Sequence, residues 1–322
     1  MIYLPPLREP VRRIGTRTFD FSRQVAVMAV VNRTPDSFYD QGRTFGLDAA
    51  VAACVSAADA GADWVDIGGV PFAPGPALAA EEEIARVVPV VEAVRAASDV
   101  VISVDTFDAR VARAALAAGA DVINDTTGLH DPDLARVVAD SDATLVVTHS
   151  LAAPRGAGPR TQFARPEYED VVAEVAEFLA DRVSYALESG VASDRLIIDP
   201  GHDLNKNTLQ SLELTRRLAE IAELGYPVLA AVSNKDFVGE TLDAPRGERV
   251  EGSLAAAVVA IMQGARIVRM HNVRESVAAV RMTEAILGSR APAGELVHNM
   301  GEMNVSDAGP QGPHRNSAVE NR

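Results

Sequence analysis

The sequence predicts a TIM-type α/β barrel, in which eight parallel strands each precede a helix. Three observations lead to this prediction. The predicted strands are short apolar runs without polar alternation, which is typical of parallel strands covered on both faces. Eight such runs alternate with helical segments over roughly 270 residues, the size of a (β/α)8 barrel. Glycine precedes several runs, as at Gly61, Gly119 and Gly264, and suits the left-handed residue that ends a helix.

Residues 100–128 show the repeating unit most clearly, with a buried strand ending at Asp105, a helix, and a second buried strand ending at Asn124. The other units follow the same pattern. We expect further strands over Val25–Val31, Trp64–Ile67, Ala143–Val147, Arg195–Ile198, Val228–Val232 and Ala265–Val268, and helices over Leu47–Ala60, Glu81–Ala97, Asp131–Ser141, Tyr168–Glu188, Leu209–Leu224, Val250–Gln263 and Val273–Leu287. An open doubly wound sheet is the alternative, but neither GxGxxG nor GxxxxGK[ST] occurs where that fold needs it.

One barrel domain over residues 24–289 accounts for these elements. The segment 1–23 contains Pro5, Pro6 and Pro10 and reads as an extended lead-in or a hairpin. The segment 290–322 is rich in Gly, Pro, Asn and Ser, and we expect it to be disordered.

Composition restricts the class of protein. The net charge of −15 argues against nucleic acid and anionic membranes as partners. No apolar run approaches the ~20 residues needed to span a bilayer, and the N-terminus lacks the apolar core of a secretory signal. The single cysteine, Cys54, excludes an internal disulfide and is expected at a buried helix position. We therefore expect a cytoplasmic protein.

Polar residues follow nearly every predicted strand, at the end where a barrel carries its active site. Each Asp or Asn alone could be a helix cap or a satisfied core group, and for Asp66, in the body of its strand, we favour that interpretation. The histidines show no HExxH and no paired cysteines, so a zinc site is not expected. The set comprises Asn32, Asp66, Asp105, Asn124, His149, Asp199, Lys235, Arg269 and His271.

This set divides by charge. Asp105, Asn124 and Asp199, with Lys235, suit a flat heterocycle that carries N–H donors and a carbonyl, because a carboxylate accepts paired N–H bonds and an ammonium donates to oxygen or nitrogen. Arg269 and His271 are two residues apart and project to the same side of an extended backbone. Together with Asn32 they suit a phosphate or diphosphate, and the Asn32 carbonyl oxygen could reach a bound Mg²⁺.

The motifs around these residues resemble dihydropteroate synthase. They occur in the family's order over about Val25–Leu287, and as a set they are highly specific. They are Asn32-Arg-Thr-Pro-Asp-Ser-Phe, Asp66-Ile-Gly-Gly, Ser103-Val-Asp-Thr, Ile123-Asn-Asp, Ile198-Asp-Pro-Gly, Ser233-Asn-Lys, Glu248-Arg-Val-Glu-Gly-Ser-Leu-Ala-Ala and Arg269-Met-His. The resemblance implies a TIM barrel that joins 6-hydroxymethyl-7,8-dihydropterin diphosphate to p-aminobenzoate with Mg²⁺ and releases pyrophosphate.

The resemblance also implies roles for these residues. Asp105, Asn124, Asp199 and Lys235 would hold the pterin, with Asp105 and Lys235 catalytic. Asn32, Arg269 and His271 would hold the diphosphate, with Asn32 reaching the metal. The implied mechanism is dissociative, because pyrophosphate leaves first, the pterin and the surrounding carboxylates stabilise the cation, and an amine then attacks. The family also implies a homodimer.

Departures from the family pattern lie on the side of the second substrate. After Asp66-Ile-Gly-Gly the usual Glu-Ser-Thr-Arg-Pro-Gly is Val70-Pro-Phe-Ala-Pro-Gly, and Ser-Arg-Lys-Ser is Ser233-Asn-Lys-Asp236. The usual Gly-Phe-Gly-Lys is replaced around Asp203–Lys206, and Met-His-Met-Arg-Gly is Thr148-His149-Ser-Leu-Ala. The chain therefore resembles the divergent second actinobacterial copy of the synthase, and we expect weak or absent use of p-aminobenzoate.

Two other functions remain open. A pterin-binding paralogue without catalysis is one, although it would have little use for the diphosphate contacts of Asn32, Arg269 and His271. A corrinoid-dependent methyltransferase of the same superfamily is the other, and it would need a corrinoid partner.

Overall fold

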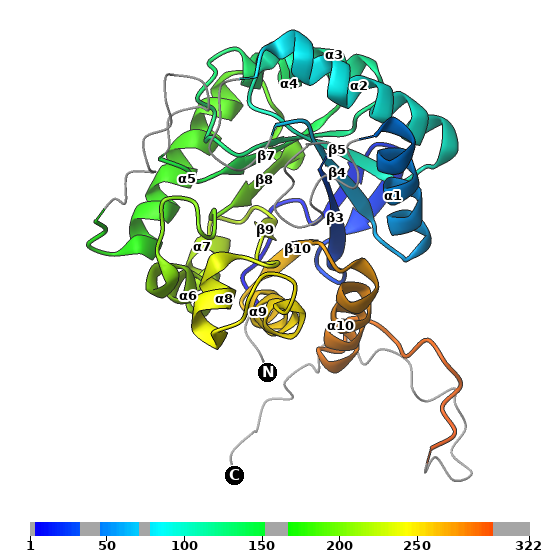
Figure 1. Cartoon of the computed structure of the whole chain (residues 1–322). Helices are drawn as coiled ribbons and strands as arrows, with labels where there is room; N and C mark the ends of the chain where they lie inside the picture. The colour runs from blue at the N-terminus through cyan, green and yellow to red at the C-terminus, as the bar shows by residue number, and fades with distance from the viewer. Residues whose placement is uncertain (1–3, 33–45, 71–77, 152–166, 299–322) are drawn as a thin grey trace, which may run out of the picture.

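Eight parallel strands form a closed barrel in the computed structural model, which describes residues 4–32, 46–70, 78–151 and 167–298 (Figure 1). The strands follow one another around the barrel in chain order, and the last pairs with the first. They are β3 (Ala26–Asn32), β4 (Trp64–Gly68), β5 (Val101–Asp105), β6 (Val122–Asp125), β7 (Thr144–Thr148), β8 (Leu196–Asp199), β9 (Val228–Ala230) and β10 (Ala265–Met270). The predicted fold class is confirmed.

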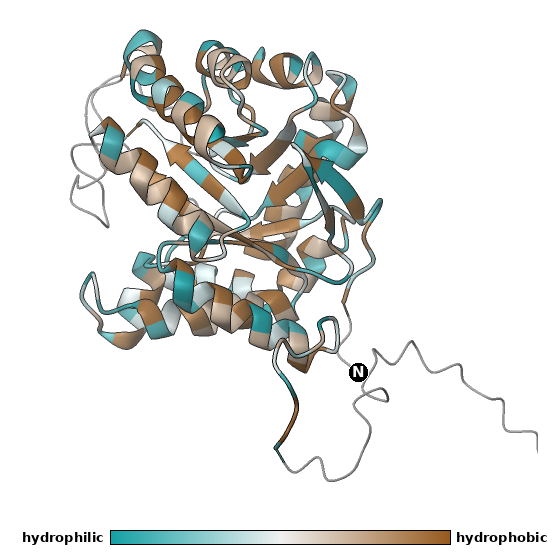
Figure 2. Ribbon diagram, turned by 90° about the vertical axis from the view of Figure 1, so that its right-hand side faces the viewer, coloured by the Kyte–Doolittle hydropathy of each residue, from teal (hydrophilic) through white to brown (hydrophobic). Residues whose placement is uncertain are grey.

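Helices surround the barrel as an outer ring (Figure 1). Figure 2 shows strands that are mostly hydrophobic and helices that carry both hydrophilic and hydrophobic residues, as expected when only the helices face water. The helices are α1 (Leu47–Asp59), α2 (Ala80–Ala97), α3 (Ala109–Ala117), α4 (Leu134–Ala139), α5 (Val171–Glu188), α6 (Thr208–Arg216), α7 (Leu218–Ala222), α8 (Asp236–Leu242), α9 (Val250–Met262) and α10 (Val273–Ile286), with a 3-10 turn at Ser193–Arg195.

Two hydrophobic cores hold the fold together. The larger lies between the strands and the helices and includes Cys54, which is fully buried, as predicted. The smaller fills the barrel interior with alternate side chains of the strands, such as Met28, Trp64 and Ile267. Burial also raises the pKa of the Cys54 thiol to about 12, so this cysteine stays protonated and is a packing residue.

A hairpin of β1 (Val11–Ile14) and β2 (Arg17–Asp20) lies within the predicted lead-in and closes the amino-terminal end of the barrel. Phe19 belongs to the interior core and packs edge-on against Trp64, with ring centroids 5.8 Å apart. Arg12 is buried and donates to the carbonyl oxygens of Asp194 (3.0 Å) and Leu196 (2.6 Å) at the start of β8. Because this end is plugged, a ligand can enter only at the carboxyl end of the strands.

Two segments differ from the prediction. The helix expected over Leu209–Leu224 is divided at Arg217, whose backbone leaves the helical region (φ −109°, ψ 21°) and whose guanidinium pairs with Asp170 and Glu220. Helix α8 lies where the sequence predicted neither a helix nor a strand, because it is short and its first amides are capped from another loop. The carboxylate of Asp203 accepts hydrogen bonds from the amides of Asp236 (2.7 Å) and Phe237 (3.2 Å).

Two further sequence predictions concern the C-terminal tail and membrane-spanning helices. Residues 290–298 contain no helix or strand, and the rest of the predicted tail lies outside the described residues. Within the described ranges, no helix is both long enough and apolar enough to cross a membrane.

Candidate active site

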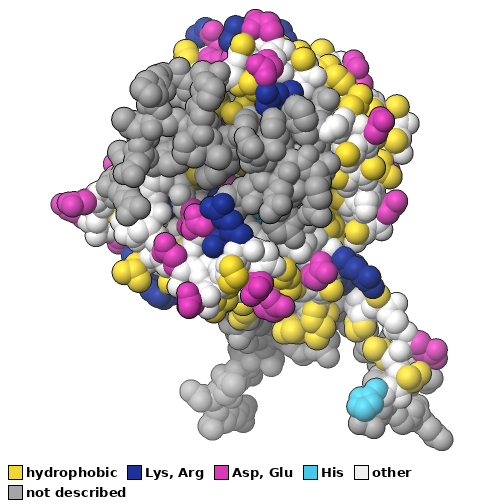
Figure 3. Space-filling view, viewed as in Figure 1, with side chains coloured by type: hydrophobic (Ala, Val, Ile, Leu, Met, Phe, Trp, Pro, Cys, Tyr) yellow, Lys and Arg dark blue, Asp and Glu magenta, His cyan; other side chains and the backbone are white. Residues whose placement is uncertain are grey.

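One cavity at the carboxyl ends of the strands brings all the predicted ligand-binding residues together. It has a volume of about 240 Å³ and lies on the face shown in Figure 3, where acidic and basic side chains are neighbours near the centre. Its lining includes Asn32, Asp105, Asn124, Asp199, Lys235, Arg269 and His271. The topology of the barrel explains this convergence, because each of these residues ends a strand or follows one closely.

Asp66 lies in the body of β4 and joins two lining residues to the core. Its side chain is fully buried and accepts hydrogen bonds from Ser103 Oγ (2.6 Å), Asn124 Nδ2 (3.1 Å) and Arg269 Nε (2.7 Å). Asp66 is a satisfied core group, as favoured from the sequence, but its partners include two predicted ligand-binding residues. It therefore fixes the orientation of the Asn124 amide and of the Arg269 guanidinium.

The orientation of Asn124 determines which atom it offers to a ligand. A carboxylate only accepts hydrogen bonds, so the amide nitrogen of Asn124 must face Asp66. The amide oxygen is buried and has no hydrogen-bond partner among the described residues. Asn124 is consequently set to accept an N–H from a ligand in the cavity.

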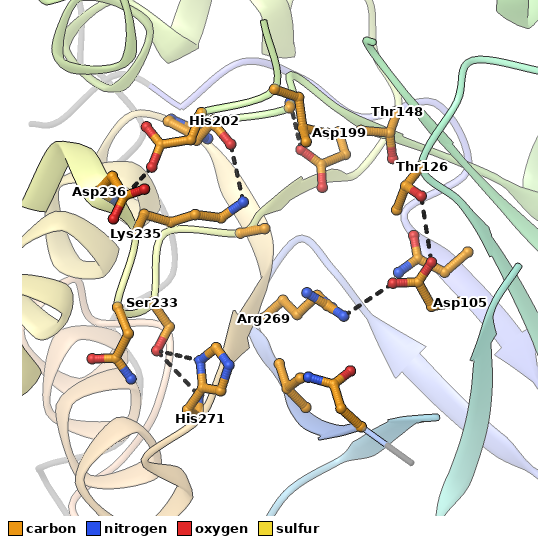
Figure 4. A pocket seen from close by; sticks show the side chains of 18 of the residues that line it. Asp105, Thr126, Thr148, Asp199, His202, Ser233, Lys235, Asp236, Arg269 and His271 are labelled. Carbon is orange, nitrogen blue, oxygen red and sulfur yellow. Dashed lines mark hydrogen bonds and ion pairs between the residues drawn. The ribbon is translucent and has the colours of Figure 1, made fainter. Parts of the chain in front are cut away.

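Arg269 lies across the cavity between two carboxylates. Its Nη2 donates to Asp105 Oδ2 at 3.3 Å, in addition to its bond with Asp66 (Figure 4). Burial alone would lower the pKa of this guanidinium, but Asp66 and Asp105 outweigh burial and raise it. Arg269 therefore remains a cation in the centre of the site, and the Nη1 group has no hydrogen-bond partner in the described part of the chain.

Asp199 ends β8 and is almost completely buried. Burial raises the pKa of its carboxyl group to about 6, although the Gly201 amide (2.7 Å), Lys235 and Arg269 each favour the ionised form. Gly201 has φ +69°, and a Cβ there would lie 2.1 Å from the His149 carbonyl oxygen. Only glycine therefore allows the turn that brings this amide to Asp199.

Lys235 enters the cavity from the side opposite Asp105 (Figure 4). Its Nζ donates to the carbonyl oxygen of His202 at 3.0 Å, and burial lowers the pKa of its ammonium group. His271 lies nearby, with its amide and its Nδ1 each 3.1 Å from Ser233 Oγ. Asp105 and Asp199 on one side and Lys235 and His271 on the other thus give the cavity an acidic wall and a wall of nitrogen groups.

Residue 148, and not the neighbouring histidine, faces this cavity from β7. The sequence set named His149, but side chains alternate along a strand, and it is Thr148 that lines the cavity. His149 is buried, with Nδ1 2.8 Å from Lys206 Nζ, and burial lowers its pKa to about 3. His149 is therefore neutral, and together with Lys206 it supports the loop after β8. The strict period of two could have identified Thr148 from the sequence.

The described residues offer no preformed metal cage, since no three His, Cys, Asp or Glu side chains among them are grouped as metal ligands. Asn32 ends β3 at the cavity, and its Oδ1 lies 2.9 Å from where a Cβ on Gly68 would sit, so glycine leaves room for this oxygen. Mg²⁺ commonly takes one or two protein oxygens and completes its shell with phosphates and water. Asn32 fits a magnesium ion that arrives with a diphosphate.

The part of the site that departs from the family pattern carries little positive charge. Among the described lining residues, Lys235 and Arg269 are the cations. Asn234 is buried and Asp236 is exposed. Arg249 fixes both residues, because its Nη1 donates hydrogen bonds to the backbone oxygen of Asn234 (3.1 Å) and to Asp236 Oδ1 (3.0 Å). Val70 also lines the cavity, and residues 71–77 of the altered loop lie outside the described residues.

Comparisons with known proteins identify the family of this chain. The family model described as "Pterin binding enzyme" matches residues 28–271. A relative from Mycobacterium leprae named "Inactive dihydropteroate synthase 2" is 45% identical over 271 residues, which are 83% of this chain and 92% of that protein. The "Dihydropteroate synthase" of Escherichia coli is 38% identical over 265 residues, covering 82% and 92%.

A solved structure gives the same result for the fold. The dihydropteroate synthase of Xanthomonas albilineans with 4-aminobenzoic acid superimposes with a TM-score of 0.79 and 39% identity, covering 88% of this chain and 99% of that one. The family predicted from the motifs is therefore confirmed. The chain belongs to the family of pterin-binding enzymes, and within it resembles dihydropteroate synthases.

Proposed function

We propose that this chain binds 6-hydroxymethyl-7,8-dihydropterin diphosphate with Mg²⁺ and releases pyrophosphate when an amine attacks the methylene carbon. The observation that carries the proposal is the division of the cavity. Asp105, Asn124 and Asp199 present hydrogen-bond acceptors from β5, β6 and β8, and Lys235 faces them from the opposite side. An aminopyrimidinone ring has the complementary N–H donors and a carbonyl.

Asn32, Arg269 and His271 would hold the diphosphate beside this ring. Arg269 is cationic, and its Nη1 group can donate to a phosphate oxygen without breaking the bonds to Asp66 and Asp105. Asn32 would supply the oxygen for Mg²⁺, which neutralises part of the diphosphate charge when bound.

The residues around the ring account for the chemistry. The bond between the methylene carbon and the bridging oxygen breaks, and its electron pair leaves with pyrophosphate. Positive charge then develops on the pterin, where the carboxylates of Asp105 and Asp199 stabilise it and Lys235 holds the ring in place. The amine nitrogen forms the new bond to carbon and releases a proton.

The cavity has few groups that could bind the carboxylate of the second substrate. A carboxylate such as that of p-aminobenzoate needs a cation or several N–H donors, but the altered positions are Asn234 and Asp236, and Asp236 is acidic. We therefore propose weak or absent use of p-aminobenzoate. The word "Inactive" in the name of the M. leprae relative supports the same conclusion.

A pterin binder without catalysis is the second candidate. It is favoured by the ion pairs that Arg269 makes with Asp66 and Asp105, since these two carboxylates offset the positive charge that the guanidinium would offer to a diphosphate. No observation among the described residues favours a corrinoid-dependent methyltransferase.

We also propose a cytoplasmic homodimer. Helices α9 and α10 pack side by side and leave large apolar side chains exposed, namely Val259, Met262, Met282 and Ile286. Such a patch is suited to contact with a second copy of the same chain.

The test is pyrophosphate release from the pterin diphosphate with Mg²⁺, measured with and without p-aminobenzoate. We expect release that p-aminobenzoate does not accelerate. Acceleration at ordinary p-aminobenzoate concentrations would contradict the proposed loss of the second-substrate site. If the protein binds the pterin and releases no pyrophosphate, the non-catalytic binder is correct.

A further inference from the structure

Unpartnered polar atoms are concentrated at the cavity. Among the described residues, seven buried side-chain nitrogen or oxygen atoms have no hydrogen-bond partner. Four of them belong to residues that line the cavity: Asn124 Oδ1, Thr148 Oγ1, His202 Nδ1 and Asn234 Oδ1. Buried polar atoms are nearly always paired in folded proteins, so a ligand or ordered water in the cavity must supply the partners of these four atoms.

Thr148 is the member whose position is best defined. It ends β7 and pairs in register with Asp199 of β8, while Val146, two residues earlier, pairs with Asn124 of β6. Val146 belongs to the interior core, so Thr148, on the same face of the strand, also points into the barrel. Figure 4 shows its side chain beside Asp199 at the acidic wall.

The hydroxyl of Thr148 makes no hydrogen bond within the described part of the chain. The residue is 1% exposed and lines the cavity, and its oxygen has no hydrogen-bond partner among the described residues. A buried hydroxyl in this condition lowers stability relative to a methyl group of the same shape. The family motif has methionine at this position, so the hydroxyl is a difference of this chain. This departure lies beside Asp199 and not, as expected from the sequence, on the side of the second substrate.

We infer that Thr148 determines ligand specificity by hydrogen bonding to the N–H-bearing edge of the bound heterocycle, between Asn124 and Asp199. The inference rests on the proposed function, since it takes the ligand to be a pterin. The Asn124 amide oxygen and the Asp199 carboxylate accept hydrogen bonds on either side, and the Thr148 hydroxyl extends this row of acceptors. The ligand thereby replaces the partner that the protein lacks.

The test compares Thr148→Val with the unchanged full-length protein, by calorimetric titration with 6-hydroxymethylpterin and by thermal unfolding without ligand. Valine keeps the shape and removes the hydroxyl. We expect affinity about three- to tenfold weaker, together with a melting temperature about 2 °C higher. Thr148→Ser, which keeps the hydroxyl, should retain affinity within about twofold.

Thr283→Val is the matched control. Thr283 is a buried threonine on α10, distant from the cavity, and its hydroxyl donates to Ala279 O at 2.8 Å. This variant should lose stability and keep its affinity, the reverse of Thr148→Val. Unchanged affinity in Thr148→Val would refute the inference alone. Failure of the unchanged protein to bind the pterin would refute the proposed function and the inference with it.

Discussion

The substitution Asp66→Asn tests whether the core organises the site. It keeps the size of the side chain and removes its charge. The carboxylate of Asp66 accepts hydrogen bonds from three donors, Ser103 Oγ, Asn124 Nδ2 and Arg269 Nε. The amide of asparagine has a single accepting oxygen, and its own NH2 group must face at least one of these donors. Breaking a buried ion pair by removing one partner typically costs about 3–5 kcal/mol.

We therefore expect the free energy of unfolding to fall by about 3 kcal/mol, since Arg269 keeps its weaker contact with Asp105 at 3.3 Å. Stability alone cannot distinguish a role in the site from a role in the core. The second measurement is affinity for 6-hydroxymethylpterin, which we expect to fall at least tenfold because the Asn124 amide is released from its fixed orientation. Urea unfolding and calorimetric titration provide the two values.

Asp63→Asn is the matched control for this experiment. Asp63 is also a buried aspartate, and its carboxylate pairs with Arg17 (3.3 Å) and Arg281 (3.0 Å) but touches no residue that lines the cavity. This variant should be destabilised and should bind the pterin normally. Equal affinity in Asp66→Asn, Asp63→Asn and the unchanged protein would refute the claim that Asp66 positions Asn124 and Arg269.

Three further predictions address pH, the plug of the barrel and assembly. The folded pKa of Asp199, about 6, lies above its unfolded value of about 3.8, so its contribution to stability falls as pH rises from about 4 to 6. Asp199→Asn should therefore stabilise the ligand-free protein at pH 8, by on the order of 2–3 kcal/mol relative to its effect at pH 4. A difference in unfolding free energy that does not change with pH would contradict this. Phe19→Ala should cost about 3–5 kcal/mol of stability, because it opens a cavity against Trp64, while pterin affinity stays unchanged; weaker binding would mean that the plug shapes the site. Met282→Glu should convert the proposed dimer to monomers in sedimentation experiments, while Leu187→Glu, at an exposed leucine on α5, should not; dimers in both variants would place the interface elsewhere.

The sequence predicted the barrel because each strand is a continuous apolar run that ends in a polar residue. Asn32, Asp105 and Asp199 could be assigned to one cavity for the same reason, since parallel strands place their carboxyl ends together. Contacts between loops were not predictable, because no local pattern encodes them. Helix α8 depends on Asp203 from the loop after β8, and the partners of Asp66 lie 37, 58 and 203 residues away.

The acidic wall gives a reason to expect pterin binding that does not depend on catalysis. Asp199 is held as a carboxylate against burial, and Asn124 and Thr148 each bury an atom that has no partner among the described residues. Each of these features lowers the stability of the empty protein, and each is relieved by one ligand edge that carries N–H donors. The altered positions Asn234 and Asp236 have no part in this edge, because they follow β9 near Lys235 on the opposite side of the cavity. Loss of the second substrate therefore leaves the recognition of the first intact.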